Sequence, residues 1–302
     1  KGLHKIYIIV CNRHKQQKRL TAKRFFFPFA PFKMFSSIKL MAVLAALIAL
    51  RIILNFISVR LPGVGVSISF AWIPTMLLGW VFGPVHGFVW GFVLDTICYA
   101  ITPSSVWYWM YAIQEPIVGF LAGISSSICL LRAHKEKTNP MYDILDQQFM
   151  LLAFVVTSLF SIFLWTDTSK QSVKNLDTYK IITCVMLAAY IIIMECFTFI
   201  QIKGFERHKQ KTLTFIYATM LVTIVTLIFS FALGPISAVQ YLNYVNGVYP
   251  DNYLTYGIVF YLVPRVIVES IKTPLEALAM FGLIMATQPI LRSINNAIKN
   301  KW

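Results

Sequence analysis

Residues 79–95 read GWVFGPVHGFVWGFVLD, and this stretch decides the fold. Two apolar segments meet at Phe82-Gly83-Pro84, a turn too short to contain a polar connection. After the turn, glycines and one acid recur every fourth residue and share one helix face: Gly83, Gly87, Gly91 and Asp95. A glycine groove of this kind lets another backbone approach closely, and we expect it to hold the two segments together. An acid inside an apolar helix is costly, so Asp95 is a candidate functional residue.

The composition of the whole chain is that of a membrane protein. Of the 302 residues, 58% are hydrophobic and 13% are charged, whereas a soluble domain has about 25% charged residues. The mean hydropathy is +0.68. Several apolar runs approach or exceed the roughly 18 residues of a membrane-spanning helix. The sequence therefore predicts an all-α polytopic protein of the plasma membrane.

Eight apolar segments are expected to be membrane helices, although the second is too short to span upright. They cover approximately residues 39–58, 71–82, 84–102, 111–131, 149–165, 181–202, 213–233 and 257–287. Residues 59–70 alternate in polarity and are expected to form a structured loop over the membrane face, and residues 234–256 a long loop rich in Tyr and Asn. The chain divides into a basic N-terminal arm, one membrane domain and a C-terminal tail, at residues 1–38, 39–288 and 289–302.

The formal net charge of +15 is concentrated in a few places. Twenty of the 27 Lys and Arg residues lie in four patches, at residues 1–39, 132–137, 203–211 and 292–301. A basic protein can bind nucleic acid, but apolar segments separate these patches. Their alternation follows the positive-inside rule, so both termini are predicted to be cytoplasmic. We expect the patches to contact anionic lipid headgroups, and we expect no nucleic-acid partner.

The sequence predicts neither a catalytic site nor a metal site. It contains no HExxH, GxSxG or Walker motif, so ATP hydrolysis is not expected. The five cysteines lack metal-ligand spacing, the histidines are scattered, and no cofactor is expected. A membrane-embedded enzyme would have only Asp95 and Glu115 as a polar catalytic pair. A structural scaffold protein would leave the buried charges unexplained.

Charged residues from four separate segments are predicted to converge in the outer half of the membrane. They are Arg51, Asp95, Glu115 and Arg265. An outward-facing ligand pocket requires such convergence. Because guanidinium groups bind carboxylates bidentately, Arg51 and Arg265 are candidate ligand-binding residues. Further candidates at the same level are Trp107, Trp109, Tyr111 and Gln114.

Two of these groups have an alternative structural interpretation. The last helix carries charges of alternating sign on one face, at Arg265, Glu269, Lys272 and Glu276. Neighbours in this row can form salt bridges that only lock the bundle; Glu269 is nevertheless kept as a candidate binding residue. The aromatic residues at 107–111 form either an interfacial belt or a wall on which a flat ring system stacks.

Three stretches resemble the substrate-binding membrane subunits, or S components, of energy-coupling factor (ECF) vitamin transporters, especially the folate group. They are ALIALRIILNFISVRLP (46–62), VSISFAWIPTMLLGWVFGPVHGFVWGFVLD (66–95) and VPRVIVESIKTPLEALAMFGL (263–283). The resemblance implies a six-helix bundle that captures a vitamin on the outer side. It also implies docking on a transmembrane coupling subunit that carries two ATPase subunits. The family's small-residue docking motifs correspond to Ala42, Ala45, Ala46 and Ala49.

The chain differs from this family by two additional segments, and we expect residues 149–202 to be an inserted helical hairpin. The predicted ligand is folate or a related pterin. Arg51 and Arg265 would pair with its carboxylates, Asp95 or Glu115 would accept hydrogen bonds from its ring, and Trp107 or Trp109 would stack on it. Riboflavin or another B vitamin is the alternative. A flavin has fewer anionic groups and would leave two buried arginines without a partner.

Overall fold

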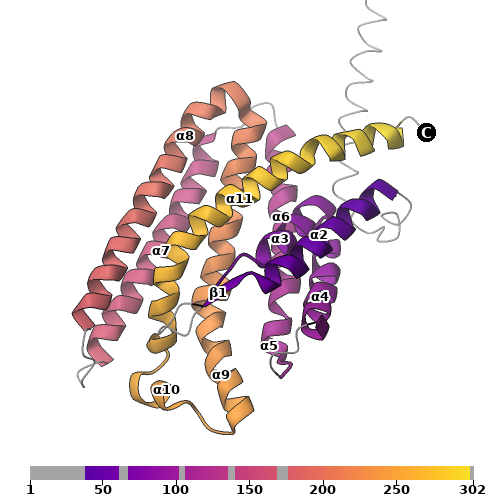
Figure 1. Ribbon diagram of the computed structural model, residues 1–302. Coiled ribbons are helices and arrows are strands. Elements are labelled where there is room, and N and C mark those ends of the chain that lie inside the picture. Colours follow the sequence, from indigo (N-terminus) through magenta and orange to yellow (C-terminus); the bar gives the residue numbers. More distant parts are fainter. Residues whose placement is uncertain (1–37, 61–66, 102–105, 135–139, 169–175, 300–302) are drawn as a thin grey trace, which may run out of the picture.

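The structure is a computed structural model that describes residues 38–60, 67–101, 106–134, 140–168 and 176–299 (Figure 1). Its elements in chain order are α2 (Ile38–Phe56), β1 (Ser58–Arg60), β2 (Ser67–Ser69), α3 (Trp72–Phe82), α4 (Pro84–Ile101), α5 (Trp109–Ala112), α6 (Gln114–His134), α7 (Pro140–Thr168), α8 (Leu176–Val225), the π-helix η2 (Thr226–Leu233), α9 (Gly234–Asn246), α10 (Asp251–Tyr256) and α11 (Val259–Lys299). The predicted helical membrane fold is confirmed. The predicted N-terminal arm lies outside the described residues, apart from Ile38.

Five of the described helical stretches are long and apolar enough to cross a membrane. They are Pro84–Ile101, Trp109–Ala133, Met141–Leu164, Lys180–Phe205 and His208–Asn246. Eight membrane segments were predicted, the second of them too short to span upright. The helices Leu40–Phe56 and Trp72–Phe82 are apolar but shorter than these five stretches. Helix α11 is long, but it contains the four charged residues at 265–276.

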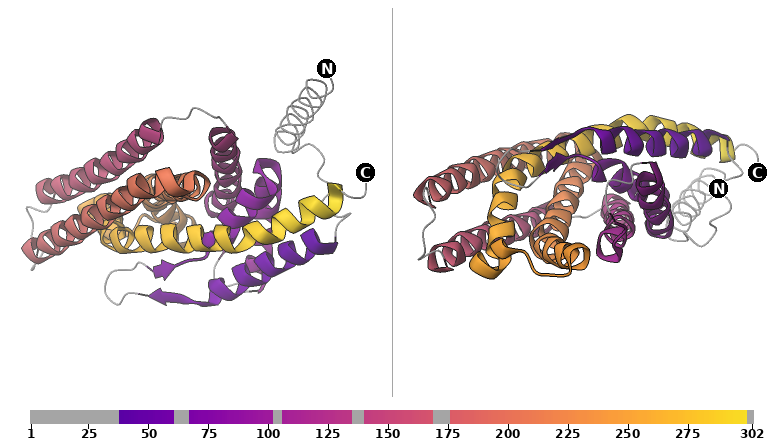
Figure 2. Two further views of the ribbon diagram at one scale, coloured as in Figure 1. Left: turned by 90° about the horizontal axis from the view of Figure 1, so that it is seen from above. Right: turned by 60° about the horizontal axis from the view of Figure 1, so that its bottom comes forward.

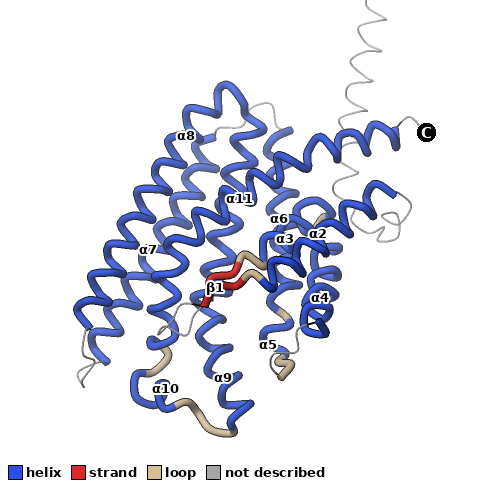
Figure 3. Tube along the Cα trace, viewed as in Figure 1, coloured by secondary structure: helices blue, strands red, loops and turns tan. Residues whose placement is uncertain are grey.

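Two expected loops contain regular structure. Residues 58–60 and 67–69 pair as antiparallel strands, with Ser58 opposite Ser69 (Figure 3). The expected loop at 234–256 is instead mostly helical, because α9 continues directly from η2 and α10 follows. The predicted C-terminal tail is also helical as far as Lys299, since α11 continues through it.

The glycine groove of α4 packs mainly against α6. Gly83 alone separates α3 from α4, and its φ of 92° is one that glycine adopts readily. A Cβ atom added to Gly91 would meet the backbone of Glu115 at 2.7 Å, and one added to Gly87 would overlap the backbone of Gly119. The expected contact between the second and third segments is present, since the added Cβ of Gly87 would also meet Gly79 Cα of α3 at 2.9 Å. The contact with α6 was not predicted. Helix α6 contributes its own glycine at the same level and fits into the groove.

The extra hairpin forms α7 and the first half of α8 and is packed into the side of the bundle (Figures 1 and 2). Within it, the rings of Phe154 and Tyr190 stack with centroids 4.1 Å apart. Both belong to a hydrophobic cluster that includes Val266 of α11. The hairpin therefore shares a hydrophobic core with the last helix.

One buried acid anchors the start of this hairpin. Asp143 of α7 is 0% exposed. Its Oδ1 accepts hydrogen bonds from Arg132 Nε of α6 at 2.8 Å and from the Tyr217 hydroxyl of α8 at 2.9 Å. The carboxylate thus joins three helices, and an isolated buried charge would be strongly unfavourable without such partners.

A second, larger hydrophobic core holds the remaining helices together. It combines Leu44 and Leu47 of α2 with Leu77 of α3, Val118 of α6 and Met280 of α11. Helices α2 and the C-terminal half of α11 lie along the same side of the bundle (Figure 2). This packing brings the middle of α2 close to α3, α4 and α6, where the predicted charges lie.

Candidate functional site

A buried ion pair joins α2 to α6. Arg51 Nε donates a hydrogen bond to Glu115 Oε1 at 2.9 Å, and Arg51 Nη2 pairs with the same oxygen. The residues are only 5% and 3% exposed. Arg51 Nη1 also donates to Asn55 Oδ1 at 3.2 Å, and Thr75 Oγ1 donates to Glu115 Oε2 at 3.3 Å. The protein itself therefore supplies the counter-charge for Arg51, as a buried guanidinium requires.

Asp95 and Cys98 of α4 lie close to this ion pair. Asp95 is partly buried and interacts electrostatically with both Glu115 and Arg51. Cys98, almost one helical turn further on, is buried and lies within electrostatic range of the same charges. Three of the four predicted buried charges are thus brought together. Cys98 was not a candidate, because a single cysteine in an apolar helix usually acts as a small hydrophobic residue.

An aromatic cluster lies between α5 and α9, beside the start of α6. The Tyr108 ring has its centroid 5.6 to 6.0 Å from those of Tyr111, Tyr241 and Tyr244, and the centroids of Tyr111 and Tyr241 are 5.7 Å apart. Of the predicted aromatic candidates, Tyr111 belongs to this cluster. Trp109 contacts its edge, with a centroid 6.2 Å from that of Tyr108. Trp107 is 47% exposed.

The sequence analysis missed Tyr241 and Tyr244 because their segment was expected to be a loop. In α9 they are three residues apart and therefore lie on one helix face. The helical periodicity of these tyrosines was the signal that could have identified them.

Gln114 and Arg265 lie against α9 near the tyrosines. Gln114 Nε2 donates to Ser237 Oγ at 3.3 Å, and Arg265 Nη2 donates to the carbonyl oxygen of Gly234 at 3.3 Å. Arg265 lies within electrostatic range of Tyr111. Its Nε is buried and has no hydrogen-bond partner within the described part of the chain. Of the two arginines predicted to bind ligand, only Arg265 keeps an unsatisfied donor.

The other charges of α11 form a buried chain of ion pairs. Lys272 Nζ lies 3.2 Å from Glu269 Oε1 and 3.5 Å from Glu276 Oε1. Ser230 Oγ of η2 donates to Glu269 Oε1 at 2.9 Å, and the ammonium group lies 5.3 Å from the centre of the Trp72 ring. This geometry favours the structural interpretation for Lys272 and Glu276, and extends it to Glu269. Within the described residues, Arg265 makes no ion pair with Glu269.

The small residues of α2 lie on the surface of the molecule. All four predicted docking positions are exposed, at Ala42, Ala45, Ala46 and Ala49. Exposed small side chains allow close approach of a partner helix in a membrane. Their role in docking remains a prediction.

Comparisons with known proteins cover most of the chain. Residues 35–175 match the family model described as ECF-type riboflavin transporter, S component. The uncharacterized protein MG313 of Mycoplasma genitalium is 33% identical over 288 residues, which cover 91% of this chain and 96% of the relative. An MG313 homolog of Mycoplasma pneumoniae is 31% identical over 285 residues, with the same two coverages. No solved structure matches.

Proposed function

The chain belongs to the S-component family of ECF-type transporters, with the family match in residues 35–175, and we propose that it captures riboflavin or a closely related flavin. It is a transporter subunit and not an enzyme. Membership of this family implies the ECF module as its partner. We propose that this module consists of a transmembrane coupling subunit and two ATPase subunits, which supply the energy of ATP hydrolysis.

The ion pair between Arg51 and Glu115 carries the choice of a flavin over folate. The folate prediction required two buried arginines to bind two ligand carboxylates. Glu115 already neutralises Arg51, so the charge requirement for a dianionic ligand is lost. Riboflavin is uncharged at neutral pH, and the matching family model is named for riboflavin transport.

The tyrosine cluster and its neighbours supply suitable contacts for a flavin. A flat ring system stacks favourably on aromatic side chains such as Tyr108 and Tyr241. The free Nε–H of Arg265 and the amide of Gln114 can donate hydrogen bonds to ring carbonyl oxygens. We propose that Trp109 extends the same aromatic surface and that Asp95 accepts hydrogen bonds from the ribityl hydroxyl groups.

Folate is a second candidate because of the unsatisfied Nε of Arg265. A single carboxylate placed there would accept a charge-assisted hydrogen bond, which is stronger than one to a neutral carbonyl. In this alternative Arg265 would have to bind the ligand's charge without help from Arg51.

We propose that the tyrosine cluster faces the outside and that both termini are cytoplasmic. The turn between the two halves of α8, which carries the basic patch at 203–211, lies at the opposite end of the bundle from α5 and α9 (Figure 1). An excess of Lys and Arg is typical of cytoplasmic loops.

Titration of the purified full-length protein with riboflavin tests the proposal, because flavin fluorescence changes when the ring is stacked on aromatic side chains. We expect saturable quenching that excess folate does not reverse. Displacement by folate, together with direct folate binding, would favour the second candidate instead. Absence of saturable binding of riboflavin would refute the flavin proposal. Co-purification with a coupling subunit and two ATPases tests the partners separately.

A further inference from the structure

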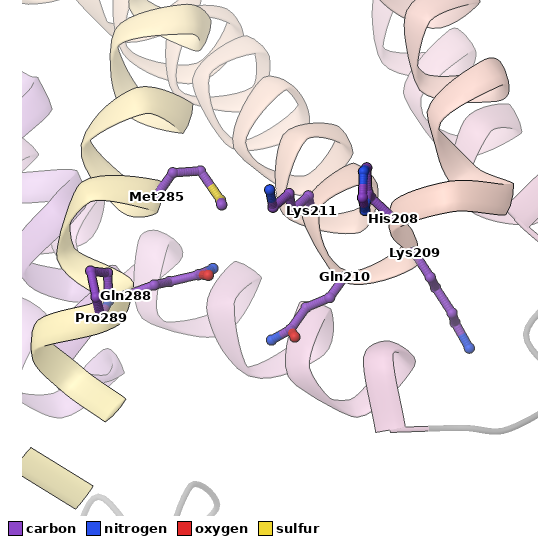
Figure 4. Close-up of a pocket in the computed structure, with 7 residues that line it drawn as sticks. All are labelled: His208, Lys209, Gln210, Lys211, Met285, Gln288 and Pro289. Carbon is purple, nitrogen blue, oxygen red and sulfur yellow. The ribbon is translucent and has the colours of Figure 1, made fainter. Parts of the chain in front are cut away.

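A basic pocket lies far from the candidate ligand site, between α8 and the last part of α11. Its volume is about 360 Å³. It is lined by His208, Lys209, Gln210 and Lys211 of α8 and by Met285 and Gln288 of α11, among others (Figure 4). In this view Lys211 and Met285 point toward each other across the opening, whereas Lys209 extends away from it. The described lining residues include no Asp or Glu.

A break in α8 creates one wall of this pocket. His208 has φ −141° and ψ 57°, which is not helical, so a new helical run begins directly after it. The first N–H groups of a helix have no partner within that helix and carry a partial positive charge. At this break the partial positive charge of the backbone N–H groups adds to the charges of Lys209 and Lys211. The pocket thus combines the positive charge of backbone N–H groups and lysine side chains with the side-chain amides of Gln210 and Gln288.

The depth of the pocket in the membrane follows from the helices that meet there. The spans Lys180–Phe205 and His208–Asn246 join at the break. Their junction must therefore lie near one surface of the bilayer, at the level of the lipid headgroups. Met285 and Pro289 add apolar surface to the same pocket.

We propose that this pocket binds the phosphate headgroup of an anionic membrane lipid. Basic pockets between membrane helices bind such headgroups because the cations neutralise the phosphate. The volume lies at the lower end of the range for small-molecule sites, about 300–1,000 Å³, and is suited to a headgroup. The apolar surface of Met285 and Pro289 can contact the part of the lipid nearest its acyl chains. A free phosphate ion could use the same donors, but it would leave this apolar surface uncovered.

Binding of a short-chain lipid to the purified full-length protein tests the proposal. The probes are dihexanoyl phosphatidylglycerol, dihexanoyl phosphatidylcholine and inorganic phosphate. Each is titrated in a non-ionic detergent, the two lipids below their micelle concentrations, while the unfolding temperature is followed. We expect phosphatidylglycerol alone to stabilise the protein, and we expect the effect to weaken as salt is added. Equal effects of the two lipids would overturn the proposal. Stabilisation by inorganic phosphate at equal concentration would assign the pocket to a free anion and also overturn it.

Substitution of the lysines locates the binding. Lys211→Gln should weaken phosphatidylglycerol binding about fivefold, because a cation near an anionic headgroup contributes about 1 kcal/mol. Lys209→Gln should weaken it less, because the Lys209 side chain extends away from the opening. Lys203→Gln is the matched control. Its ammonium lies 4.3 Å from the centre of the Phe199 ring and does not line the pocket. Equal weakening by the control would show diffuse surface charge and overturn the proposal.

Riboflavin affinity provides a check on folding in all three variants. The basic pocket and the tyrosine cluster lie at opposite ends of the bundle, so riboflavin affinity should be unchanged if the variants are folded. If riboflavin itself does not bind, the unfolding temperature of each lipid-free variant serves the same purpose. The lipid proposal therefore does not depend on the identity of the transported vitamin.

Discussion

Gly87 of α4 and Gly119 of α6 lie so close together that a methyl group on either one would overlap the backbone of the other. The same helix pair is close at Gly91, where an added Cβ would meet the backbone of Glu115 at 2.7 Å. Within a membrane, close backbone packing of this kind replaces the hydrophobic driving force that joins helices in water. The position of Glu115, and with it the ion pair to Arg51, depends on this contact.

We expect Gly119→Ala to destabilise the protein by about 1–3 kcal/mol, because overpacking forces the backbones of α4 and α6 apart. The measurement is thermal unfolding in detergent. Gly282→Ala is the matched control, since an added Cβ there would contact nothing within 4 Å. The control should be neutral or stabilising, because alanine favours a helix by about 1 kcal/mol over glycine. Equal unfolding temperatures for the two variants would contradict the close contact.

Removal of one partner of the Arg51–Glu115 ion pair should be more harmful than removal of both. Glu115→Ala leaves a buried guanidinium uncompensated, which costs about 3–5 kcal/mol. The double variant Arg51→Ala with Glu115→Ala should recover part of this loss, as a double-mutant cycle on unfolding free energies would show. Strictly additive effects would mean that the two side chains do not interact.

The inserted hairpin should depend on Asp143. Replacing it by Asn removes the charge that Arg132 and Tyr217 share, and we expect a loss of about 3 kcal/mol from this buried network. Asp146, also on α7, is exposed, so Asp146→Asn should change stability by less than about 0.5 kcal/mol. Thermal unfolding of both variants compares them directly. A neutral Asp143→Asn substitution would be evidence against this anchor.

Arg265 should be required for ligand binding in both candidate functions. We expect Arg265→Ala to weaken riboflavin binding roughly tenfold, the effect of losing one hydrogen bond of about 1.5 kcal/mol. If the ligand is folate, the loss should be larger, because a charged hydrogen bond is about twice as strong. Fluorescence titration measures the affinity of the variant for each vitamin. Unchanged affinity for either vitamin would remove Arg265 from the site.

The exposed alanines of α2 should serve partner docking and not ligand capture. Ala46→Leu adds a bulky side chain to a smooth face, so we expect it to prevent co-purification of the coupling subunit while riboflavin affinity stays unchanged. Ile53→Leu, at another exposed position of the same helix, is the control. Normal co-purification of the Ala46→Leu variant would place the docking surface elsewhere.

Much of the helical architecture could be predicted from apolar runs, because lipid allows few alternatives to a helix. The residues at the candidate site were also largely identified, since a charge in an apolar segment is conspicuous. Their pairing was not. Arg51 and Glu115 are 64 residues apart, and whether they meet depends on how α2 and α6 pack. The expected use of Arg51 for a ligand carboxylate did not take this internal partner into account.

The helical conformation of residues 234–246 was missed on physical grounds. Gly234 and Pro235 indicate a turn in isolation, but both are tolerated in a membrane helix when neighbouring groups satisfy the backbone. Here the side chain of Arg265 donates a hydrogen bond to the carbonyl oxygen of Gly234. Such a contact from a distant helix cannot be read from the local sequence.

The π-helix Thr226–Leu233 sets the rotational phase of everything that follows it in the same long helix. A π-helical segment holds more residues per turn than an α-helix, which turns the downstream residues by about 100° for each extra residue. Deleting one residue from this segment would rotate Ser237 and Tyr241 away from Gln114 and Tyr108 and leave every side chain of the site intact. The geometry of the proposed riboflavin site therefore depends on the number of residues in η2, although η2 lies outside the tyrosine cluster.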